Sequence, residues 1–174
     1  IHAYRSRGHL RAQTNPVRER KDRKPLLELV DFGLSDADLD IVFEAGIELG
    51  IGASTLRKIV ETLKFIYEGT IGFEYMYIRN PEKLAWLRNK IEKESLAHAL
   101  TLDEKKRILS KLNEAVVFEN FLHTKYVGQK RFSLEGGETT IAALDKMINV
   151  SAELGVEEVV IGMAHRGRLN VLAN

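Results

Sequence analysis

Helical spacing of apolar residues constrains the first two thirds of the chain most strongly. Residues 54–68 place one apolar residue every three or four positions on a single face: Leu56, Ile59, Val60, Leu63, Ile66 and Tyr67. This period predicts an amphipathic helix that Gly69 ends. Asn80-Pro81 predicts another helix start, because Pro is favoured at the first helical position. Leu84, Leu87 and Ile91 follow it at helical spacing.

Polar start signals predict three more helices in this region. Residues 2–12 are expected to form a short basic helix that Gly8 weakens. Ser35 with Asp38 is a plausible N-terminal cap for a helix over about 36–45. Thr101 and Glu104 have the spacing of a capping box, which predicts a helix to about His123. The residues expected to be buried in that last helix are Ile108, Leu112, Ala115 and Val116.

The last third of the chain changes character. Lys125 to Gly137 is expected to be an ordered loop, followed by a helix over 138–154 that ends at Gly155. The side chains expected to point inward from this helix are Ile141, Leu144, Ile148 and Ala152. Val159 to Ile161 then predict a short buried strand within 156–163, and the loop 164–168 leads to an apolar start at Leu169. Helix, strand, loop and helix together form an α/β unit.

The pattern therefore predicts a mainly α region over 1–124, followed by the first, incomplete α/β unit of a second domain over 125–174. The chain has no cysteine, so neither a disulfide framework nor a thiolate metal site is expected. No apolar run reaches the roughly 18 residues that cross a bilayer, and no membrane role is expected. Both ends look interrupted, so we expect a piece of a longer protein.

Positive charge is concentrated at the start of the chain. Residues 1–24 carry eight Lys and Arg against Glu19 and Asp22, a net charge of +6. One interpretation is a solvated, mobile arm that packs on other parts of the protein; another is a docking segment for an acidic partner. Nucleic-acid binding is the least favoured, because no aromatic residues alternate with the charges as single-strand binding requires. Residues 15–25 are expected to be an exposed connector.

The loop after the predicted strand holds the best candidates for chemistry. Ligands of open α/β sheets lie beyond the carboxyl ends of the strands, where His165 and Arg166 would stand. Arginine offers planar paired donors to a carboxylate or phosphate, and histidine is suited to move protons near neutral pH. An anionic ligand follows from this pattern. The competing interpretation is that Arg166 and Arg168 pair with acids elsewhere and His165 is an ordinary loop residue.

Other motifs give weaker signals. The basic, glycine-containing segment 125–138 precedes a predicted helix and resembles an anion site, but Glu135 and Glu138 would themselves complement the helix dipole. A structural linker is the better interpretation. The sequence has no phosphate-binding P-loop, and its five histidines form neither an i, i+4 pair nor a His-Glu-x-x-His motif. No metal site is therefore expected within the chain.

Several of these segments resemble one family. The runs 121–138 and 159–174 resemble the decarboxylating component of 2-oxoglutarate dehydrogenase, as do residues 4–12, residues 71–78 and the Trp86-Leu87 helix. The resemblance implies the N-terminal part of an enzyme that uses thiamine diphosphate and Mg²⁺ to decarboxylate 2-oxoglutarate. The acyl group then passes to a lipoyl group of the dihydrolipoyl succinyltransferase component. The cofactor supplies the difficult chemistry, and the protein orients and tunes it.

The resemblance assigns two site residues. His165 matches the family's active-site histidine, whose expected role is to bind the substrate and help position or move a proton. Arg166 matches the arginine that reaches the cofactor and the substrate carboxylate. Residues 121–138 are expected to be framework, and residues 125–174 to begin the thiamine-diphosphate-binding domain. Tyr77 stands where many relatives have histidine.

The resemblance also places much of the site outside the chain. The Gly-Asp-Gly segment that holds the diphosphate and Mg²⁺, a second substrate histidine and the activating glutamate are expected beyond Asn174, and the flexible docking segment before Ile1. The chain alone is therefore expected to be inactive. The same pattern would fit a 2-oxoadipate dehydrogenase, a 2-oxoglutarate decarboxylase, or a helical dimerisation and docking module. A bacterial cytoplasmic homodimer is expected, with a mitochondrial matrix location as the alternative.

Overall fold

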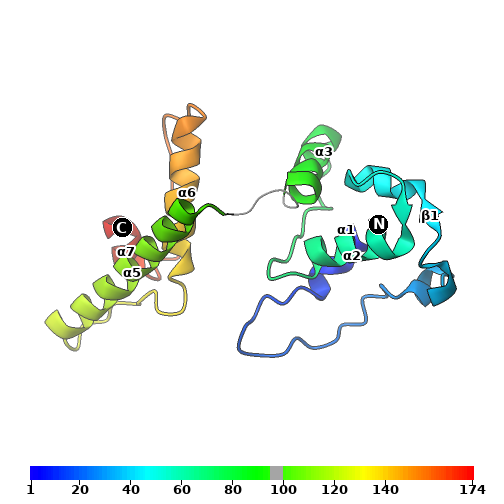
Figure 1. Cartoon of the computed structure of the whole chain (residues 1–174). Helices are drawn as coiled ribbons and strands as arrows, with labels where there is room; N and C mark the ends of the chain where they lie inside the picture. The colour runs from blue at the N-terminus through cyan, green and yellow to red at the C-terminus, as the bar shows by residue number, and fades with distance from the viewer. Residues whose placement is uncertain (95–99) are drawn as a thin grey trace. The chain divides into compact units, whose positions relative to one another are not determined.

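The computed structural model describes residues 1–94 and 100–174. The chain folds into two compact units, unit 1 (Ile1–His98) and unit 2 (Ala99–Asn174). Helices dominate both, as the sequence predicted, and Figure 1 shows the elements of each unit. The boundary predicted at 124/125 falls inside unit 2, because the helix α5 (Leu102–Lys125) packs against the helices that follow it.

Unit 1 contains the helices predicted from apolar spacing. Thr55 caps α2 by accepting a hydrogen bond from the Lys58 backbone, and Asn80 caps α3 in the same way through Lys83. A five-residue π-helical segment, η5, follows α3 directly. The helical elements that build the core are α1 (His2–Arg7), η1 (Gly8–Leu10), α2 (Leu56–Tyr67), α3 (Pro81–Asn89) and η5 (Lys90–Glu94).

The apolar face of α2 is the centre of unit 1. Of the six residues predicted to lie on this face, five are buried and Val60 is partly buried. Gly8 lies against this helix: a Cβ at that position would come within 2.6 Å of the Tyr67 Cβ. The glycine that was expected only to weaken a helix therefore lets η1 approach α2 closely.

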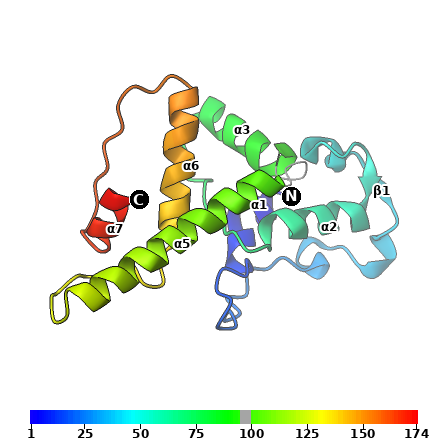
Figure 2. The ribbon, with the colours of Figure 1, turned by 60° about the vertical axis from the view of Figure 1, so that its left-hand side comes forward.

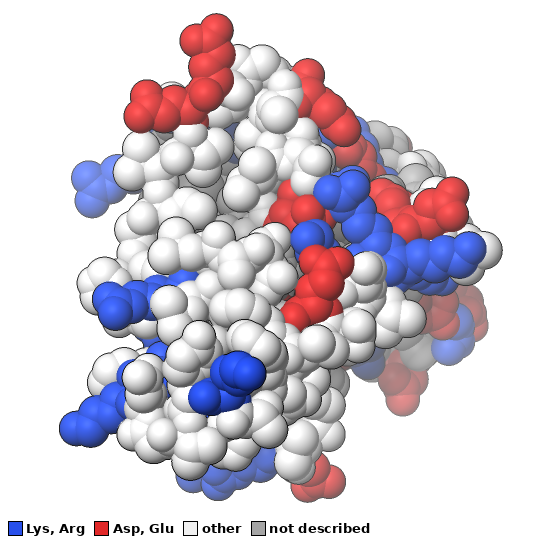
Figure 3. Space-filling model, turned by 90° about the vertical axis from the view of Figure 1, so that its left-hand side faces the viewer, with Lys and Arg blue, Asp and Glu red and all other residues white. Residues whose placement is uncertain are grey.

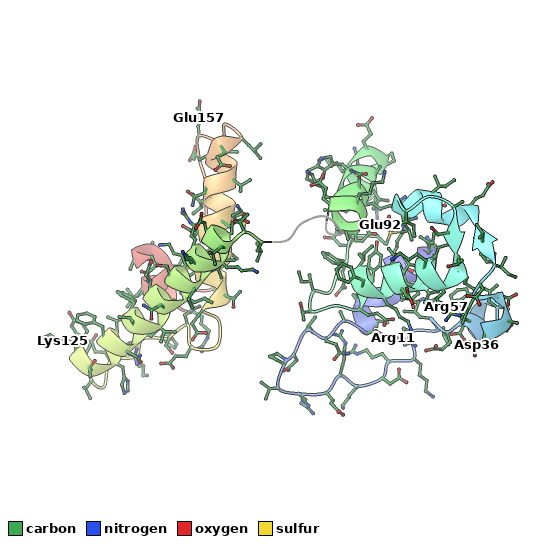
Figure 4. All side chains as sticks on the ribbon, viewed as in Figure 1. Arg11, Asp36, Arg57, Glu92, Lys125 and Glu157 are labelled. Atoms are coloured by element: carbon green, nitrogen blue, oxygen red, sulfur yellow. The ribbon has the colours of Figure 1, made fainter. Side chains whose placement is uncertain are left out.

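A buried ion pair crosses this core. Glu92, 1% exposed, accepts hydrogen bonds from Arg5 Nε at 2.6 Å and Nη2 at 2.9 Å. Tyr67 donates to the same carboxylate at 2.6 Å, and its hydroxyl lies 2.7 Å from that of Tyr75. Burial and the hydrogen bond to Glu92 raise the pKa of Tyr67. The network joins α1, α2, η5 and the segment before α3. Figure 4 marks the position of Glu92.

The basic arm is not a mobile segment over its first half. Arg5 is buried in the ion pair, and Arg11 pairs with both Glu28 and Glu68. Only residues 13–24 run as an exposed connector without regular structure, as predicted for 15–25. The prediction of a solvated arm was therefore wrong for residues 1–12, because α1 packs in the core and Arg5 and Arg11 pair with acids of later segments.

The helix predicted over 36–45 was also wrong. Ser35 and Asp38 do form a capping box, but it opens only the 3-10 turn η3 (Asp36–Asp38). The strand β1 (Val42–Phe43) then pairs antiparallel with β2 (Ser54–Thr55). Backbone carbonyls of Leu39 and Ile41 accept bonds from residues 57 and 56. The backbone groups of the segment that contains Ile41 and Val42 are therefore used in strand pairing and not in a helix. The remaining short 3-10 turns of unit 1 are η2 (Leu29–Phe32) and η4 (Glu44–Leu49).

Unit 2 consists of α5, α6 (Thr139–Glu153) and α7 (Arg168–Ala173). The capping box predicted at Thr101 and Glu104 is present, and Gly155 follows the end of α6 at a φ of +83°. In Figure 2 the segment between α6 and α7 runs back beside α6 without helical structure. The two longer helices are joined by ion pairs from Arg107 to Asp145 and from Lys146 to Glu104.

The burial predicted for the helices of unit 2 was only partly correct. Ala115 and Ile141 are buried, and Ile108, Leu112 and Leu144 are partly buried. Val116 and Ile148, however, are each 43% exposed, and Ala152 is exposed as well. Ile148 lines an open space together with Ile161 and Val171, so the segments that follow α6 cover its face only loosely.

The strand predicted over 156–163 is absent, and with it the α/β unit. A strand needs a neighbour for its backbone groups, and unit 2 offers none among its described residues. Val160 is 85% exposed, although its residue type is typical of buried strands. The face of unit 2 in Figure 3 is accordingly broad and largely without charge.

None of the described helices combines the length and apolar composition that crossing a bilayer requires.

Candidate functional site

A sharp turn in unit 2 presents both residues that the sequence singled out. His165 has a φ of +69° and Gly167 a φ of +66°, so two of three successive residues are left-handed. The turn is closed by a hydrogen bond from the Arg168 backbone to the His165 carbonyl at 3.2 Å. Histidine adopts this conformation far less readily than glycine, which marks the turn as a constrained one. Both His165 and Arg166 are exposed.

This turn packs on the loop that follows α5. The Gly167 backbone donates to the Phe132 carbonyl at 2.6 Å, and Arg166 Nη1 donates to the Ser133 carbonyl at 3.2 Å. Gly167 is buried against Leu134, and a Cβ there would lie 2.6 Å from the Leu134 side chain. Glycine is therefore needed at 167 for both its backbone conformation and its lack of a side chain.

A buried carboxylate holds these two loops together. Glu119 in α5 is 4% exposed and accepts hydrogen bonds from three residues of two other segments. Its donors are the Leu134 backbone at 3.1 Å, Asn170 Nδ2 at 3.1 Å and Arg131 Nη1 at 3.3 Å. Because charged hydrogen bonds in a buried setting are strong, Glu119 fixes the loop 131–134 and α7 against α5.

Asn170 provides the second anchor on the far side of the turn. Its side chain is fully buried and also donates to the Ala115 carbonyl at 2.9 Å. The turn at 165–167 is thus held on one side by residues 132–134 and on the other by α7. Both supports lead back to Glu119, so the exposed pair stands on a rigid base.

The chemistry available at this turn is that of a cationic hydrogen-bond donor beside an imidazole. Arg166 uses one donor on a backbone carbonyl, and no ion pair to it is found among residues 1–94 and 100–174. The alternative in which Arg166 and Arg168 pair with acids is therefore not seen in the described part of the chain. The remaining guanidinium donors suit a carboxylate or phosphate, and His165 suits proton transfer.

Residues 131–134 of the segment 121–138 support the turn, but the sequence did not identify Glu119, the residue that holds them. Glu119 lies on the same helical face as Ala115 and Leu122, four residues after one and three before the other. An acidic residue between two buried apolar positions of a helix is the signal that could have identified it, because such a charge requires partners. Within the described residues no group of three or more metal-ligating side chains comes together.

Comparison with known proteins gives close relatives over the entire chain. The chain is 49% identical to the 2-oxoglutarate dehydrogenase E1 component of Cupriavidus necator and 51% identical to the multifunctional 2-oxoglutarate metabolism enzyme of Mycolicibacterium vanbaalenii. It is also 46% identical to the 2-oxoglutarate dehydrogenase E1/E2 component of Corynebacterium glutamicum. Each match covers 100% of this chain. No family model matches the chain.

The matched part of each relative is short. The chain spans 18% of the Cupriavidus protein and 14% of each of the other two. The matches cover the N-terminal part of these relatives, as the sequence motifs predicted. Sequence identity at this level, over the entire length of the chain, is far higher than a shared fold alone would give. The chain therefore belongs to the 2-oxoglutarate dehydrogenase E1 family, of which it represents an N-terminal segment.

Proposed function

We propose that the complete protein decarboxylates 2-oxoglutarate oxidatively and transfers the succinyl group to a lipoyl group of a dihydrolipoyl succinyltransferase. The observation that carries this proposal is the match of this entire chain to part of enzymes named for 2-oxoglutarate. The name of the Corynebacterium relative, an E1/E2 component, supports a link to the acyltransferase. The names of these relatives do not favour the 2-oxoadipate alternative.

The residues of the turn fit part of a site for thiamine diphosphate and its substrate. Arg166 uses one guanidinium nitrogen on the Ser133 carbonyl, and its other donors suit the anionic groups of either molecule. When bound, the cofactor would supply the electron sink for loss of CO₂. Mg²⁺ would be held by residues outside the chain, since the described residues bring no ligand cluster together. We expect the thiamine-diphosphate-binding domain to begin within 125–174.

His165 and Arg166 have separate roles in this proposal. The guanidinium of Arg166 would bind the substrate carboxylate through paired hydrogen bonds and hold the oxo acid in one orientation. The imidazole of His165 would donate a hydrogen bond to the substrate and help move a proton as charge develops. Both side chains extend from a turn whose supporting loops Glu119 holds in place. Their positions would therefore be set before the substrate arrives.

The exposed apolar residues of unit 2 support a role within a larger protein. Val159 and Val160 are 50% and 85% exposed, and their type favours a strand once neighbouring strands are present. Packing of this segment against further parts of the protein would complete the α/β unit that the sequence predicts. We expect the complete enzyme to be a homodimer of the bacterial cytoplasm, in keeping with its bacterial relatives.

The test is an assay of the full-length protein beside the 174-residue chain. Consumption of 2-oxoglutarate and 2-oxoadipate is measured with and without thiamine diphosphate and Mg²⁺. We expect the full-length protein to act on 2-oxoglutarate only when both cofactors are present, and the chain alone to be inactive. Preference for 2-oxoadipate would refute the assignment of 2-oxoglutarate as the substrate. Turnover without the cofactors would refute the thiamine-diphosphate mechanism.

A further inference from the structure

The connector between η1 and η2 encloses a polar hollow that the proposed function does not use. The hollow has a volume of about 360 Å³ and is lined by residues of the loop 13–23 alone. That volume lies at the lower end of the range for small-molecule sites, which is about 300–1,000 Å³. None of the lining residues has an aliphatic or aromatic side chain, so any ligand here would be recognised by its charge.

Arg20 gives this loop a defined shape. Its Nη1 donates to the Ala12 carbonyl at 2.7 Å and to Thr14 Oγ1 at 2.9 Å, which ties position 20 back to the start of the loop. Asn15 adds a turn by accepting hydrogen bonds from the backbones of residues 17 and 18. Arg20 Nε is shielded from solvent and has no protein partner among the described residues. A buried donor of this kind is costly unless something pairs with it.

The charges around the hollow are predominantly positive. Arg18, Arg20, Lys21 and Arg23 line it together with one acid, Glu19, for a net charge of +3. Across residues 1–94 and 100–174, none of these four cations lies within ion-pair distance of a carboxylate. The contrast is Arg11 just before the loop, which pairs with Glu28 and Glu68 (Figure 4). Cations that outnumber the nearby acids, here Glu19 and Asp22, repel one another, and a bound anion would relieve that repulsion.

We propose that the loop 13–23 is a binding site for a small anion that carries two linked phosphate groups. Three arginines offer the planar paired donors that match phosphate oxygens. The negative charge of a diphosphate is similar in magnitude to the positive charge of the residues that line the hollow. A concave site of bounded volume suits a small anion better than an acidic protein surface. Because no aliphatic or aromatic side chain lines the hollow, the diphosphate, and not an attached base or acyl group, would provide the binding energy.

The test is isothermal titration calorimetry of the chain with inorganic pyrophosphate in magnesium-free buffer. We expect saturable one-to-one binding that weakens several-fold as sodium chloride is raised from about 50 to about 200 mM. The double variant Arg18→Ala/Arg23→Ala should bind at least about tenfold more weakly. The matched control Lys105→Ala/Lys106→Ala removes two exposed charges from α5 and should bind like the wild type.

Two results would overturn the proposal. Equal weakening in both double variants, or no saturation, would mean diffuse attraction between charges and no site. Binding of an aspartate-rich peptide with the same dependence on Arg18 and Arg23, without binding of pyrophosphate, would make the loop a protein-docking segment instead. Far-ultraviolet circular dichroism checks that each variant is folded.

Discussion

Unit 1 and unit 2 each contain a buried glutamate that binds an arginine, but the two carboxylates lie in different surroundings. Glu92 lies in a core with ten buried apolar residues, where Arg5 and Tyr67 occupy its oxygens. Glu119 lies beside a core of only three, and its donors come from loops and the short helix α7. The first carboxylate joins helices within a closed core, whereas the second supports an exposed turn.

The difference indicates how each unit uses a buried charge. Burying an ion pair gains little stability over an apolar core of the same shape, but it fixes geometry when every hydrogen bond is made. In unit 1 that geometry is the packing of α1 on α2 and η5. In unit 2 it is the position of His165 and Arg166, so loss of Glu119 should affect function more than overall folding.

Removal of Glu92 is expected to have the largest effect on stability. Glu92→Ala leaves Arg5 buried without its main partner, which costs about 3–5 kcal/mol. Unfolding of unit 1 in urea, followed by Trp86 fluorescence, measures this loss. The matched control is Glu48→Ala, which removes the exposed second partner of Arg5 and should cost less than about 1 kcal/mol. Equal effects of the two variants would show that Glu92 does not organise this core.

Removal of Glu119 should disturb unit 2 locally. Glu119→Ala leaves the Leu134 backbone donor and Asn170 short of an acceptor, at a cost of about 2–3 kcal/mol. Hydrogen exchange should accelerate at residues 131–134 and 165–168, while exchange in unit 1 stays unchanged. Glu114→Ala on the same helix, which removes a partly buried pair with Lys111, is the control and should leave both loops protected. Unchanged hydrogen exchange at residues 165–168 in Glu119→Ala would show that the Glu119 carboxylate does not hold this turn in place.

A methyl group at position 167 should displace the turn. Gly167→Ala places a Cβ at 2.6 Å from Leu134 and strains a residue whose φ is +66°, at a cost of about 2 kcal/mol. Gly162→Ala is the matched control, because no atom lies within 4 Å of its Cβ and its φ is not positive. Hydrogen exchange of α7 measures both. If both variants behaved alike, the contact between the turn and Leu134 would not hold the turn in place.

The two units should also differ in their response to pH. Burial, with the nearby charge of Glu68, raises the pKa of Tyr4 to about 12, and burial also raises the pKa of Tyr67 and Tyr75. A folded pKa above the unfolded value of about 10 means that stability is constant below pH 10 and falls as pH rises toward 12. Unit 1 should therefore lose stability in this range, measured as a falling urea midpoint of Trp86 fluorescence.

Unit 2 should instead be sensitive to acid. The hydrogen bond from Arg107 lowers the pKa of Asp145, so its contribution is present above the unfolded value and lost as pH falls below about 4. Its one tyrosine, Tyr126, is 47% exposed. Hydrogen exchange of α5 and α6 between pH 10 and 11 should thus change less than that of α2. Equal alkaline loss in both units would contradict the assignment of this effect to the buried tyrosines.

Sequence patterns predicted the elements that local rules control. The helix starts at Asn80 and Thr101 and the buried face of α2 follow from spacing within a few residues, and all are present. The predicted helix over 36–45 failed because its residues pair with the distant segment 54–57. The strand over 156–163 failed because strand formation depends on a partner that unit 2 does not provide.

The candidate site shows the same limit. His165 and Arg166 were identified from their residue types and motif, and the structure places both on one exposed turn. Their support was not identified, because the contacts of Glu119 with Leu134 and Asn170 span 15 and 51 residues of sequence. A pattern confined to neighbouring residues does not contain such contacts.

The most direct test is the turnover of 2-oxoglutarate by the full-length protein that carries His165→Ala. The control is His2→Ala, which removes an exposed histidine of unit 1. Loss of positioned proton transfer typically costs about 10²–10⁴-fold in rate. We expect a fall in kcat/KM of at least about 100-fold for His165→Ala and wild-type activity for His2→Ala. Wild-type activity of His165→Ala would show that the turn is structural and that the proposed site is wrong.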